Sequence, residues 1–248
     1  MSASSEEPMR IANCSGFFGD RLAAAKEMVY GGPIDALTGD WLAELTMLIL
    51  SRIQAKAPGG GYARTFVTQM EDVMGECLDR QIKVVTNAGG LNPEGCADAV
   101  QELADQLGLN PKIAYVAGDD LAPRLDDLIQ SGHDLAHLDT GAPLGDLADR
   151  IVTANAYIGC WGIVEALNQG ADIVITGRAT DAAVVAGPAA WYHGWQRNDW
   201  NALAGAIVAG HVIECGAVPG GVGLSGLPRG RCPVSRVPPQ ARGPQAQA

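Results

Sequence analysis

Carboxylate, amide and guanidinium side chains stand directly after five short apolar segments of this chain. These segments are rich in β-branched residues and begin near positions 10, 34, 82, 113 and 173. Each one breaks off into glycine, asparagine or aspartate, which is typical of a parallel strand that ends before a helix. Because ligands of open α/β sheets bind along the carboxyl ends of the strands, we expect these polar side chains to form one site.

Four aspartates at these strand ends are candidates for acid–base catalysis or for binding Mg²⁺ through oxygen ligands, since grouped carboxylates suit both tasks. The competing interpretation is that each aspartate only caps the first turn of a helix, a role worth about 1 kcal/mol. No metal is identified by the pattern itself, and Mg²⁺ is only a candidate. The predicted catalytic residues are Asp20, Asp40, Asp119 and Asp181.

Residues able to bind a small substrate occur at the same strand ends. Arg178 follows a Thr-Gly pair directly, where a guanidinium can hold a carboxylate or phosphate through two parallel hydrogen bonds. An ion pair with a neighbouring aspartate is equally consistent with this position. The backbone amides of Gly89 and Gly90 could approach an anion, although tight turns demand glycine as well. The predicted substrate-binding residues are Asn13, Thr86, Asn87, Gly89, Gly90 and Arg178.

Three further motifs give weaker signals. His133 and His137 have the spacing of a helical zinc site, but glycines on both sides leave little room for a helix. The segment Gly221–Gly226 matches the dinucleotide-binding fingerprint, but the prolines that follow it prevent the helix that the motif requires. Cys14 and Cys160 could be nucleophiles, although buried apolar cysteines are commoner. The sequence contains neither a P-loop nor a nucleophile-elbow motif.

The charge and composition of the chain limit which classes of partner and which cell compartment are expected. The 248-residue chain has a net charge of −11, and all 28 acidic residues lie at or before Glu214, whereas four of the 17 basic residues follow it. A surface this acidic repels phosphate backbones and anionic lipid, so neither nucleic acid nor a membrane surface is expected as a partner. No apolar run reaches the roughly 18 residues of a membrane span. Without C-x-x-C pairs or a secretory leader before Met9, we expect a cytoplasmic protein.

Strand and helix patterns alternate along the chain. Strands are predicted at 10–14, 34–38, 82–86, 112–117 and 171–176. Helices are predicted at 20–29, 41–55, 62–79 and 94–107. A further helix follows the fourth strand and ends at about residue 130, and the last three helices are predicted at 157–169, 181–193 and 199–210. This alternation predicts an α/β fold with three layers, in which helices cover both faces of a mostly parallel, Rossmann-like sheet. The order of the strands cannot be inferred from the sequence.

We expect a single α/β domain at residues 9–216, preceded by a disordered start at residues 1–8. The stretch 131–150 is rich in glycine and aspartate, which predicts an excursion on the surface. Residues 217–248 contain six prolines and six glycines but no acidic or aromatic residue. Such a composition cannot bury enough apolar surface to fold, so this tail is predicted to be disordered.

Several of these segments resemble the acyclic terpene utilisation (AtuA-like) family. The resemblance runs in order from about residue 9 to residue 217. It implies a catabolic protein of the bacterial type, associated with the breakdown of branched isoprenoid acids as their acyl-CoA thioesters. Relatives continue beyond this point, so the resemblance also implies a chain truncated at its C-terminal end. The matching segments are Ile11–Asp20, Gly32–Thr46, Thr86–Pro93, Asn155–Gly159, Ile163–Leu167, Ala171–Ala183 and Gly210–Gly216.

Two functions of different classes remain open. The first is an enzyme of acyl-CoA or small-carboxylate catabolism, whose active site lies at the strand ends. The second is a non-catalytic subunit or scaffold that binds an acyl-CoA carboxylase or hydratase of the same pathway. An exposed apolar face on the helices predicted at 62–79 or 157–169 would favour the second. Either protein could also form a homo-oligomer.

Overall fold

All five predicted strands are present in the computed structural model, which describes residues 7–214 and 234–237. Parallel pairing joins them in the order β4-β5-β3-β2-β1, so the expected α/β fold is confirmed and the strand order is now known. The strands are β1 (Met9–Asn13), β2 (Ala36–Gly39), β3 (Lys83–Gly90), β4 (Ile113–Val116) and β5 (Ile173–Gly177).

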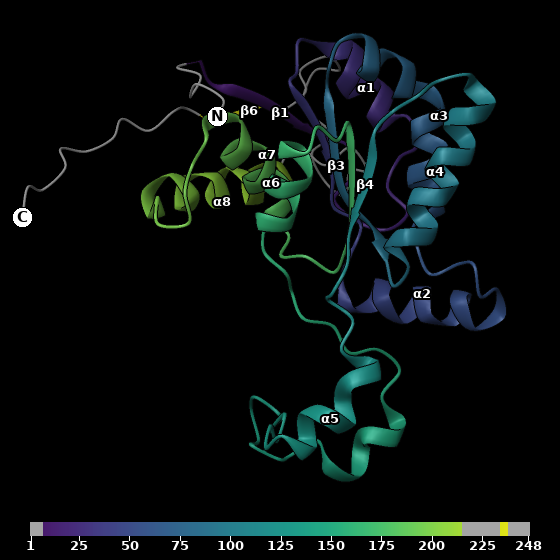
Figure 1. Cartoon of the computed structure of the whole chain (residues 1–248), viewed down its shortest axis with the longest axis vertical. Coiled ribbons are helices and arrows are strands. Elements are labelled where there is room, and N and C mark those ends of the chain that lie inside the picture. The colour runs from purple at the N-terminus through teal and green to yellow at the C-terminus, as the bar shows by residue number, and fades with distance from the viewer. Residues whose placement is uncertain (1–6, 215–233, 238–248) are drawn as a thin grey trace, which may run out of the picture.

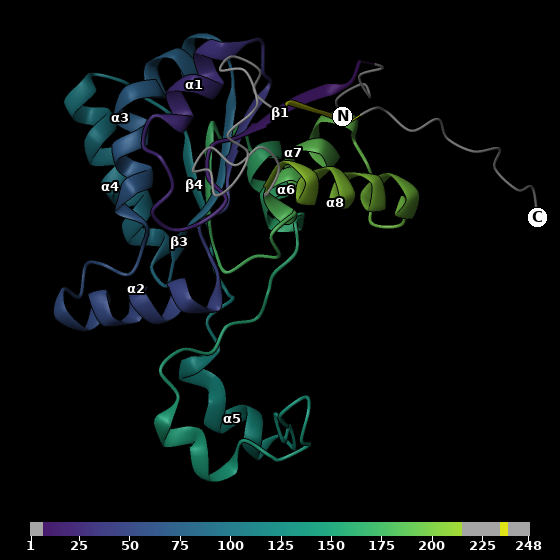
Figure 2. The same cartoon turned by 180° about the vertical axis from the view of Figure 1, so that it is seen from behind.

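Helices cover both faces of this sheet, as predicted (Figures 1 and 2). Successive side chains of a strand point to opposite faces. In β2, therefore, Leu37 packs into the first helical layer and Ala36 into the second. The first layer contains α1 (Ala24–Gly31), α3 (Arg64–Asp79) and α4 (Pro93–Leu107), and the second contains α6 (Trp161–Asn168), α7 (Ala183–His193) and α8 (Trp200–Glu214).

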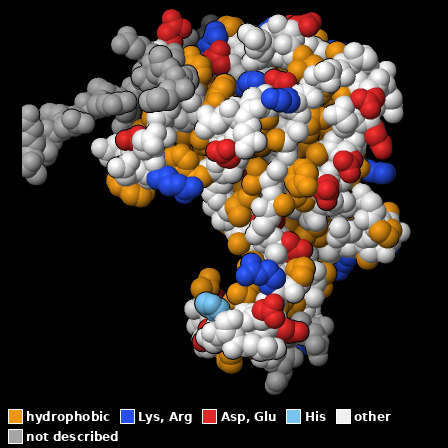
Figure 3. Space-filling view, viewed as in Figure 1, with side chains coloured by type: hydrophobic (Ala, Val, Ile, Leu, Met, Phe, Trp, Pro, Cys, Tyr) orange, Lys and Arg blue, Asp and Glu red, His pale blue; other side chains and the backbone are white. Residues whose placement is uncertain are grey.

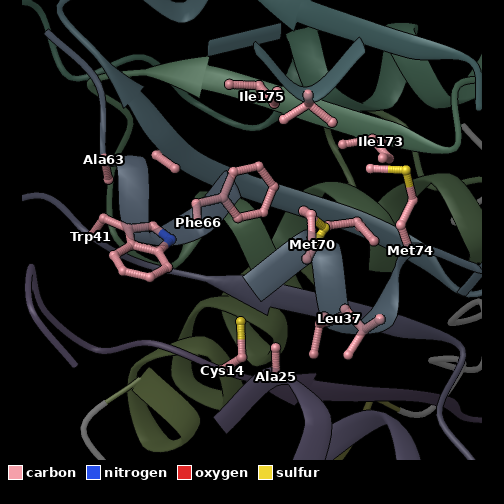
Figure 4. Packing of buried hydrophobic residues seen from close by; sticks show 14 of the residues in the cluster. Cys14, Ala25, Leu37, Trp41, Ala63, Phe66, Met70, Met74, Ile173 and Ile175 are labelled. Carbon is pink, nitrogen blue, oxygen red and sulfur yellow. The ribbon is translucent and has the colours of Figure 1, made fainter. Parts of the chain in front are cut away.

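The apolar face of α3 forms the centre of the first layer (Figure 4). Phe66, Met70 and Met74 recur at a spacing of four residues and are each at most 1% exposed. They pack in one cluster with Ile173 and Ile175 of β5. Burying one such side chain contributes roughly 1.5–3 kcal/mol. The helical periodicity of the sequence predicts this face correctly.

The strand order creates a topological switch point between β3 and β5. The chain moves in one direction from β1 through β3 to β4, and then returns to insert β5 between β3 and β4. Since parallel crossovers are right-handed, this reversal places α6, between β4 and β5, on the opposite face of the sheet from α4, between β3 and β4. Helix α7, after β5, packs on the same face as α6. The carboxyl ends of β3 and β5 are therefore where a sheet of this kind binds its ligand.

Helix α2 (Glu44–Lys56) belongs to neither layer and lies beyond the end of the sheet (Figures 1 and 2). Its Leu50 packs against the end of β3, so that a Cβ on Gly90 would lie 2.4 Å from Leu50 Cδ1. This packing brings the first turn of α2, with Glu44, to the edge that carries the polar strand ends.

Residues 121–154 project from the sheet as an arm (Figures 1 and 3). It contains the 3-10 helices η1 (Ala122–Arg124) and η2 (Gly145–Arg150) and helix α5 (Leu125–Gln130). None of the arm's described side chains is buried, and Leu138 is fully exposed. Its base closes where the backbone N–H of Leu121 donates to Ala154 O (2.7 Å). The predicted surface excursion is confirmed, and it begins earlier than expected.

Three helices begin at least three residues later than predicted. Helix α1 begins at Ala24 rather than at Asp20, α2 at Glu44 rather than at Trp41, and α6 at Trp161 rather than at Tyr157. The N-cap residues of α1 and α2 are alanines that make no side-chain cap. The prediction that Asp20 and Asp40 cap these helices is therefore wrong, because both carboxylates accept hydrogen bonds elsewhere at the strand ends.

A sixth strand contradicts part of the prediction of a disordered tail. Strand β6 (Val234–Val237) pairs antiparallel with β1. This pairing satisfies backbone groups that an edge strand would otherwise leave open. The sequence did not indicate it because four residues between prolines show no strand pattern. The rest of the tail, the Gly221–Gly226 motif and residues 1–6 lie outside the described residues.

The described cysteines and helices give two further facts. Cys14, Cys77, Cys96 and Cys160 are free and buried. None of the helices in the described part of the chain is long and apolar enough to cross a membrane.

Candidate functional site

Asp40 follows β2 directly and is 2% exposed. Asn87 of β3 donates through Nδ2 to Asp40 Oδ1 (2.5 Å), and the backbone N–H of Leu42 donates to the same oxygen (3.1 Å). The amide oxygen of Asn87 in turn accepts from the backbone N–H of Trp41 (2.8 Å). These bonds fix the Asp40 carboxylate beside the end of β3.

The buried position of Asp40 changes its protonation. Burial raises the pKa of Asp40 to about 7, against the hydrogen bonds from Asn87 and Leu42, and the charges of Glu214 and Asp181 raise it as well. A carboxyl group with a pKa near 7 can accept and return a proton at neutral pH, which is what acid–base catalysis requires.

Arg178 follows β5 and is buried beneath Tyr157, with its guanidinium carbon 4.0 Å from the centre of the tyrosine ring. Nη1 of Arg178 donates to Asp181 Oδ1 (3.1 Å), so the ion pair that the sequence left open is formed. Burial lowers the pKa of Arg178, but hydrogen bonding to Tyr157 and Asp181 outweighs it and the pKa is raised. Nε of Arg178 has no hydrogen-bond partner among the described residues.

The end of α8 brings two further polar side chains to Asp181. One ligand-type atom each from Asp181, His211 and Glu214 lies within 4.8 Å of the others. His211 Nδ1 is 3.4 Å from the Glu214 carboxylate, because residues three apart share one face of a helix. A Cβ on Gly16, in the loop after β1, would lie 2.6 Å from the backbone oxygen of Glu214. The last turn of α8 therefore lies against the strand ends.

Sequence reasoning did not place His211 and Glu214 in the site. Both belong to the Gly210–Gly216 segment that carries part of the family resemblance, and the H-x-x-E spacing at the end of a helix was an available signal. This spacing alone does not show which residues the turn approaches, since only the packing of α8 on the second face brings the turn to Asp181.

Asp119 has a different environment from Asp40. It follows β4, is 3% exposed, and accepts hydrogen bonds on Oδ2 from the backbone N–H of Arg178 (2.7 Å) and from Asn155 Nδ2 (2.9 Å). A Cβ on Gly177 would lie 2.3 Å from Asp119 Oδ1. Burial raises the pKa of Asp119. These contacts hold β4, β5 and the base of the arm together.

Two predicted residues, one at the end of β1 and one after it, form hydrogen bonds with the loop that follows this strand. Asp20, 4% exposed, accepts from the backbone N–H groups of Gly16 (3.1 Å) and Arg21 (2.7 Å). Asn13 donates through Nδ2 to Ser15 O (2.7 Å). Both side chains shape the loop on which the end of α8 rests.

The predicted residues of β3 are needed for close packing at the strand end. Thr86 donates to Gly39 O (3.0 Å) on the neighbouring β2. A Cβ on Gly89 would lie 2.5 Å from Thr176 O, and Gly90 has a φ of +55°, which favours glycine. The structure thus gives these glycines a steric reason that does not involve an anion.

The two-histidine motif and the two cysteines do not show the chemistry that the sequence offered for them. Residues 133–137 are not helical, and Nδ1 of His137 accepts the backbone N–H of Asp139 (3.2 Å) in a turn. Cys14 and Cys160 are buried, as expected. Burial raises the pKa of Cys14 to about 12 and also raises that of Cys160, so neither thiol is activated.

We define the rim cluster as Asp40, Asn87, Arg178, Asp181, His211 and Glu214. Helix capping does not explain its aspartates, because Asp40 bonds a loop amide and the N-cap of α7 is Ala182, without a side-chain cap. Residues 9–229, which include the whole rim cluster, match the family model for acyclic terpene utilisation family protein AtuA. The chain belongs to the AtuA family.

Membership in the AtuA family implies a part in acyclic terpene utilisation and confirms the resemblance seen in the sequence. Comparisons with curated proteins and with solved structures gave no match.

Proposed function

We propose that this chain is an acid–base enzyme that acts on a small carboxylate or acyl-CoA thioester in acyclic terpene catabolism. The observation that carries the proposal is Asp40, a buried carboxyl group with a pKa of about 7 at the ligand-binding edge of the sheet. At the same edge lies Arg178, which is the only lysine or arginine buried in the described part of the chain.

Asp40 is the group that moves the proton in this proposal. In its ionised form it removes a proton from the carbon next to the thioester carbonyl. The C–H bond breaks, the proton moves to Asp40, and the electron pair passes to the carbonyl oxygen, which gives an enolate. The reverse transfer restores both groups. Because Asn87 and Leu42 both bond Oδ1, Oδ2 is the oxygen that meets the substrate.

Arg178 supplies the positive charge for a carboxylate or for the developing enolate oxygen. Its Nη2 lies 4.0 Å from Glu44, whose side chain is 82% exposed. An ion pair this long and this exposed is worth little, so an incoming anion can replace Glu44 at small cost. The proposal thus gives the substrate anion a place between the first turn of α2 and the end of β5.

Deuterium exchange tests the proton transfer without knowledge of the full reaction. The protein is incubated in D₂O with a branched isoprenoid acyl-CoA thioester, and deuterium at the carbon next to the carbonyl is measured by mass spectrometry. Wild type should exchange this proton, and Asp40→Asn should not. Asp120→Asn, an exposed aspartate at the end of β4, is the matched control and should exchange like wild type.

Thermal denaturation with the same thioester tests binding separately. A ligand at about 100 times its Kd stabilises the folded state by about 2.7 kcal/mol. Arg178→Gln should reduce this effect for a carboxylate or thioester. Absence of both stabilisation and exchange in wild type would contradict the proposal.

An exposed apolar stripe on α8 favours a second candidate, a subunit that binds an acyl-CoA carboxylase or hydratase. Val208 follows Trp200 by eight residues and Val212 follows Val208 by four; Trp200, Val208 and Val212 are 71%, 64% and 61% exposed, respectively. The apolar face of α3, one of the two helices whose exposure would have favoured this candidate, is buried instead. Sedimentation with a purified acyl-CoA carboxylase would detect a complex that Val208→Glu disrupts and Thr68→Glu, at an exposed position of α3, does not.

A further inference from the structure

We propose that Asp181, His211 and Glu214 form a binding site for a divalent first-row transition-metal ion. The three side chains offer two carboxylates and one imidazole, with ligand atoms no more than 4.8 Å apart. Carboxylate and imidazole ligands lie about 2.0–2.2 Å from such an ion, so two ligands of one ion can be up to about 4.4 Å apart. A small movement of the side chains therefore completes the site.

The parts of this site are held by different elements of the fold. Asp181 follows β5 and is fixed through Oδ1 by Arg178 Nη1 (3.1 Å). His211 and Glu214 lie on the same face of the last turn of α8. The His211 side chain is 57% exposed and can turn toward an ion, whereas that of Glu214 is 16% exposed. Hydrogen bonds of the kind that Arg178 makes orient metal ligands in many sites.

Asp40 is a further carboxylate at the same edge of the sheet. Its side chain is 2% exposed, and both of its hydrogen bonds, from Asn87 and Leu42, reach Oδ1. Oδ2 accepts no hydrogen bond from the described residues. A carboxylate oxygen without a donor from the protein can be compensated by a cation or by water. The charges of Asp181 and Glu214 raise the pKa of Asp40, so its carboxylate lies within range of theirs.

The charge balance of the rim cluster fits a divalent ion. When ionised, Asp40, Asp181 and Glu214 carry three negative charges, and Arg178 supplies one positive charge. A divalent cation adds two positive charges to this group.

The imidazole decides which ions fit. Mg²⁺ prefers oxygen ligands alone, whereas imidazole suits first-row transition metals. Three protein ligands also leave coordination positions open, as in catalytic metal sites. The role we assign to the ion, polarising the substrate carbonyl oxygen beside Asp40, rests on the proposed function. The binding of the ion does not.

Metal binding can be measured on the full chain without substrate. After dialysis against a chelator, Mn²⁺ is titrated and followed by electron paramagnetic resonance, with Zn²⁺ and Mg²⁺ as competitors. We expect one Mn²⁺ per chain, displaced readily by Zn²⁺ and poorly by Mg²⁺. His211→Gln and Glu214→Gln should each weaken Mn²⁺ binding by more than about tenfold. Even residues that only hydrogen-bond to a metal ligand contribute about 10–100-fold to metal affinity.

The double variant His133→Gln/His137→Gln is the matched control, because it removes two exposed histidines from the arm. It should bind Mn²⁺ like wild type. Unchanged binding by His211→Gln, loss of binding in the control, or displacement by Mg²⁺ as strong as by Zn²⁺ would each overturn the proposal. Melting curves of His211→Gln should match those of wild type, which would show that the variant folds. If Mn²⁺ binds as expected but wild type shows no deuterium exchange with Mn²⁺ bound, the metal site stands and the proposed function fails.

Discussion

Replacing Asp40 by asparagine should stabilise the folded chain at neutral and alkaline pH, although the carboxylate lies at the centre of the candidate site. Asparagine keeps the oxygen that accepts from Asn87 and Leu42. It removes the negative charge that burial and the charges of Glu214 and Asp181 make unfavourable. A gain in stability on removing a functional group is expected where activity requires an unfavourable local arrangement.

The size and sign of this effect follow from the pKa of Asp40. Burial raises it from the usual 3.8 to about 7. Below pH 3.8 both the folded and the unfolded chain hold the proton, so the group does not alter stability. Between 3.8 and about 7 only the folded chain holds it, and wild-type stability falls as pH rises. Above this window the ionised group costs the folded state on the order of 4 kcal/mol.

Urea denaturation of wild type and Asp40→Asn, with chelator present, measures this effect. The other titrating groups occur in both proteins, so they cancel in the difference between the two free energies of unfolding. The free energy of unfolding of Asp40→Asn should rise relative to that of wild type by about 1.4 kcal/mol per pH unit between roughly pH 4.5 and 6.5. The difference should reach a plateau above pH 7.5. Asp120→Asn, which is exposed, should differ from wild type by less than about 0.5 kcal/mol throughout. A difference for Asp40→Asn that stays constant with pH would refute the reasoning.

Three further predictions concern stability and reactivity. Gly89→Ala should destabilise the chain by about 1–3 kcal/mol in urea denaturation, because its Cβ would lie 2.5 Å from a backbone oxygen. Gly75→Ala, in α3, is the control and should be neutral or stabilising, since the nearest atom to its Cβ would be 3.9 Å away. Burial raises the pKa of Asp35, but the hydrogen bonds from Arg10 outweigh it and the pKa is lowered. Asp35→Asn should therefore cost stability at pH 7 and lose that cost as the pH falls from the usual 3.8 through the lowered pKa; an equal cost at pH 7 and at acid pH would contradict this. Cys14, with a pKa raised to about 12, should resist alkylation at pH 8 in the native state and react in urea, as peptide mass mapping would show.

The parts of the fold that depend on neighbouring residues were predictable from the sequence. The five parallel strands follow from β-branched runs that end in glycine and aspartate. The buried face of α3 follows from the helical spacing of Phe66, Met70 and Met74. Helix α4 begins at Pro93 and ends before Gly108, whose φ is +68°. In each case the signal lies within a few residues of the structure that it determines.

Features that depend on distant residues were not predictable. Asp20 and Asp40 are of a residue type that is common at helix N-caps, yet both carboxylates accept hydrogen bonds from loops and strand ends instead. Asp40 bonds Asn87, which is 47 residues away. Local preference for a cap is worth about 1 kcal/mol, so a buried hydrogen bond to a distant partner can override it.

The sequence by itself determined that polar side chains would gather at the carboxyl ends of a parallel sheet, because the same strand-to-helix pattern recurs along the chain. Only the tertiary structure decided which of them meet. The return of the chain to insert β5 beside β3 places Arg178 and Asp181 near Asp40, and the packing of α8 on the second face adds His211 and Glu214. The physical reason is that strand order and layer assignment are set by long-range packing, which no local pattern encodes.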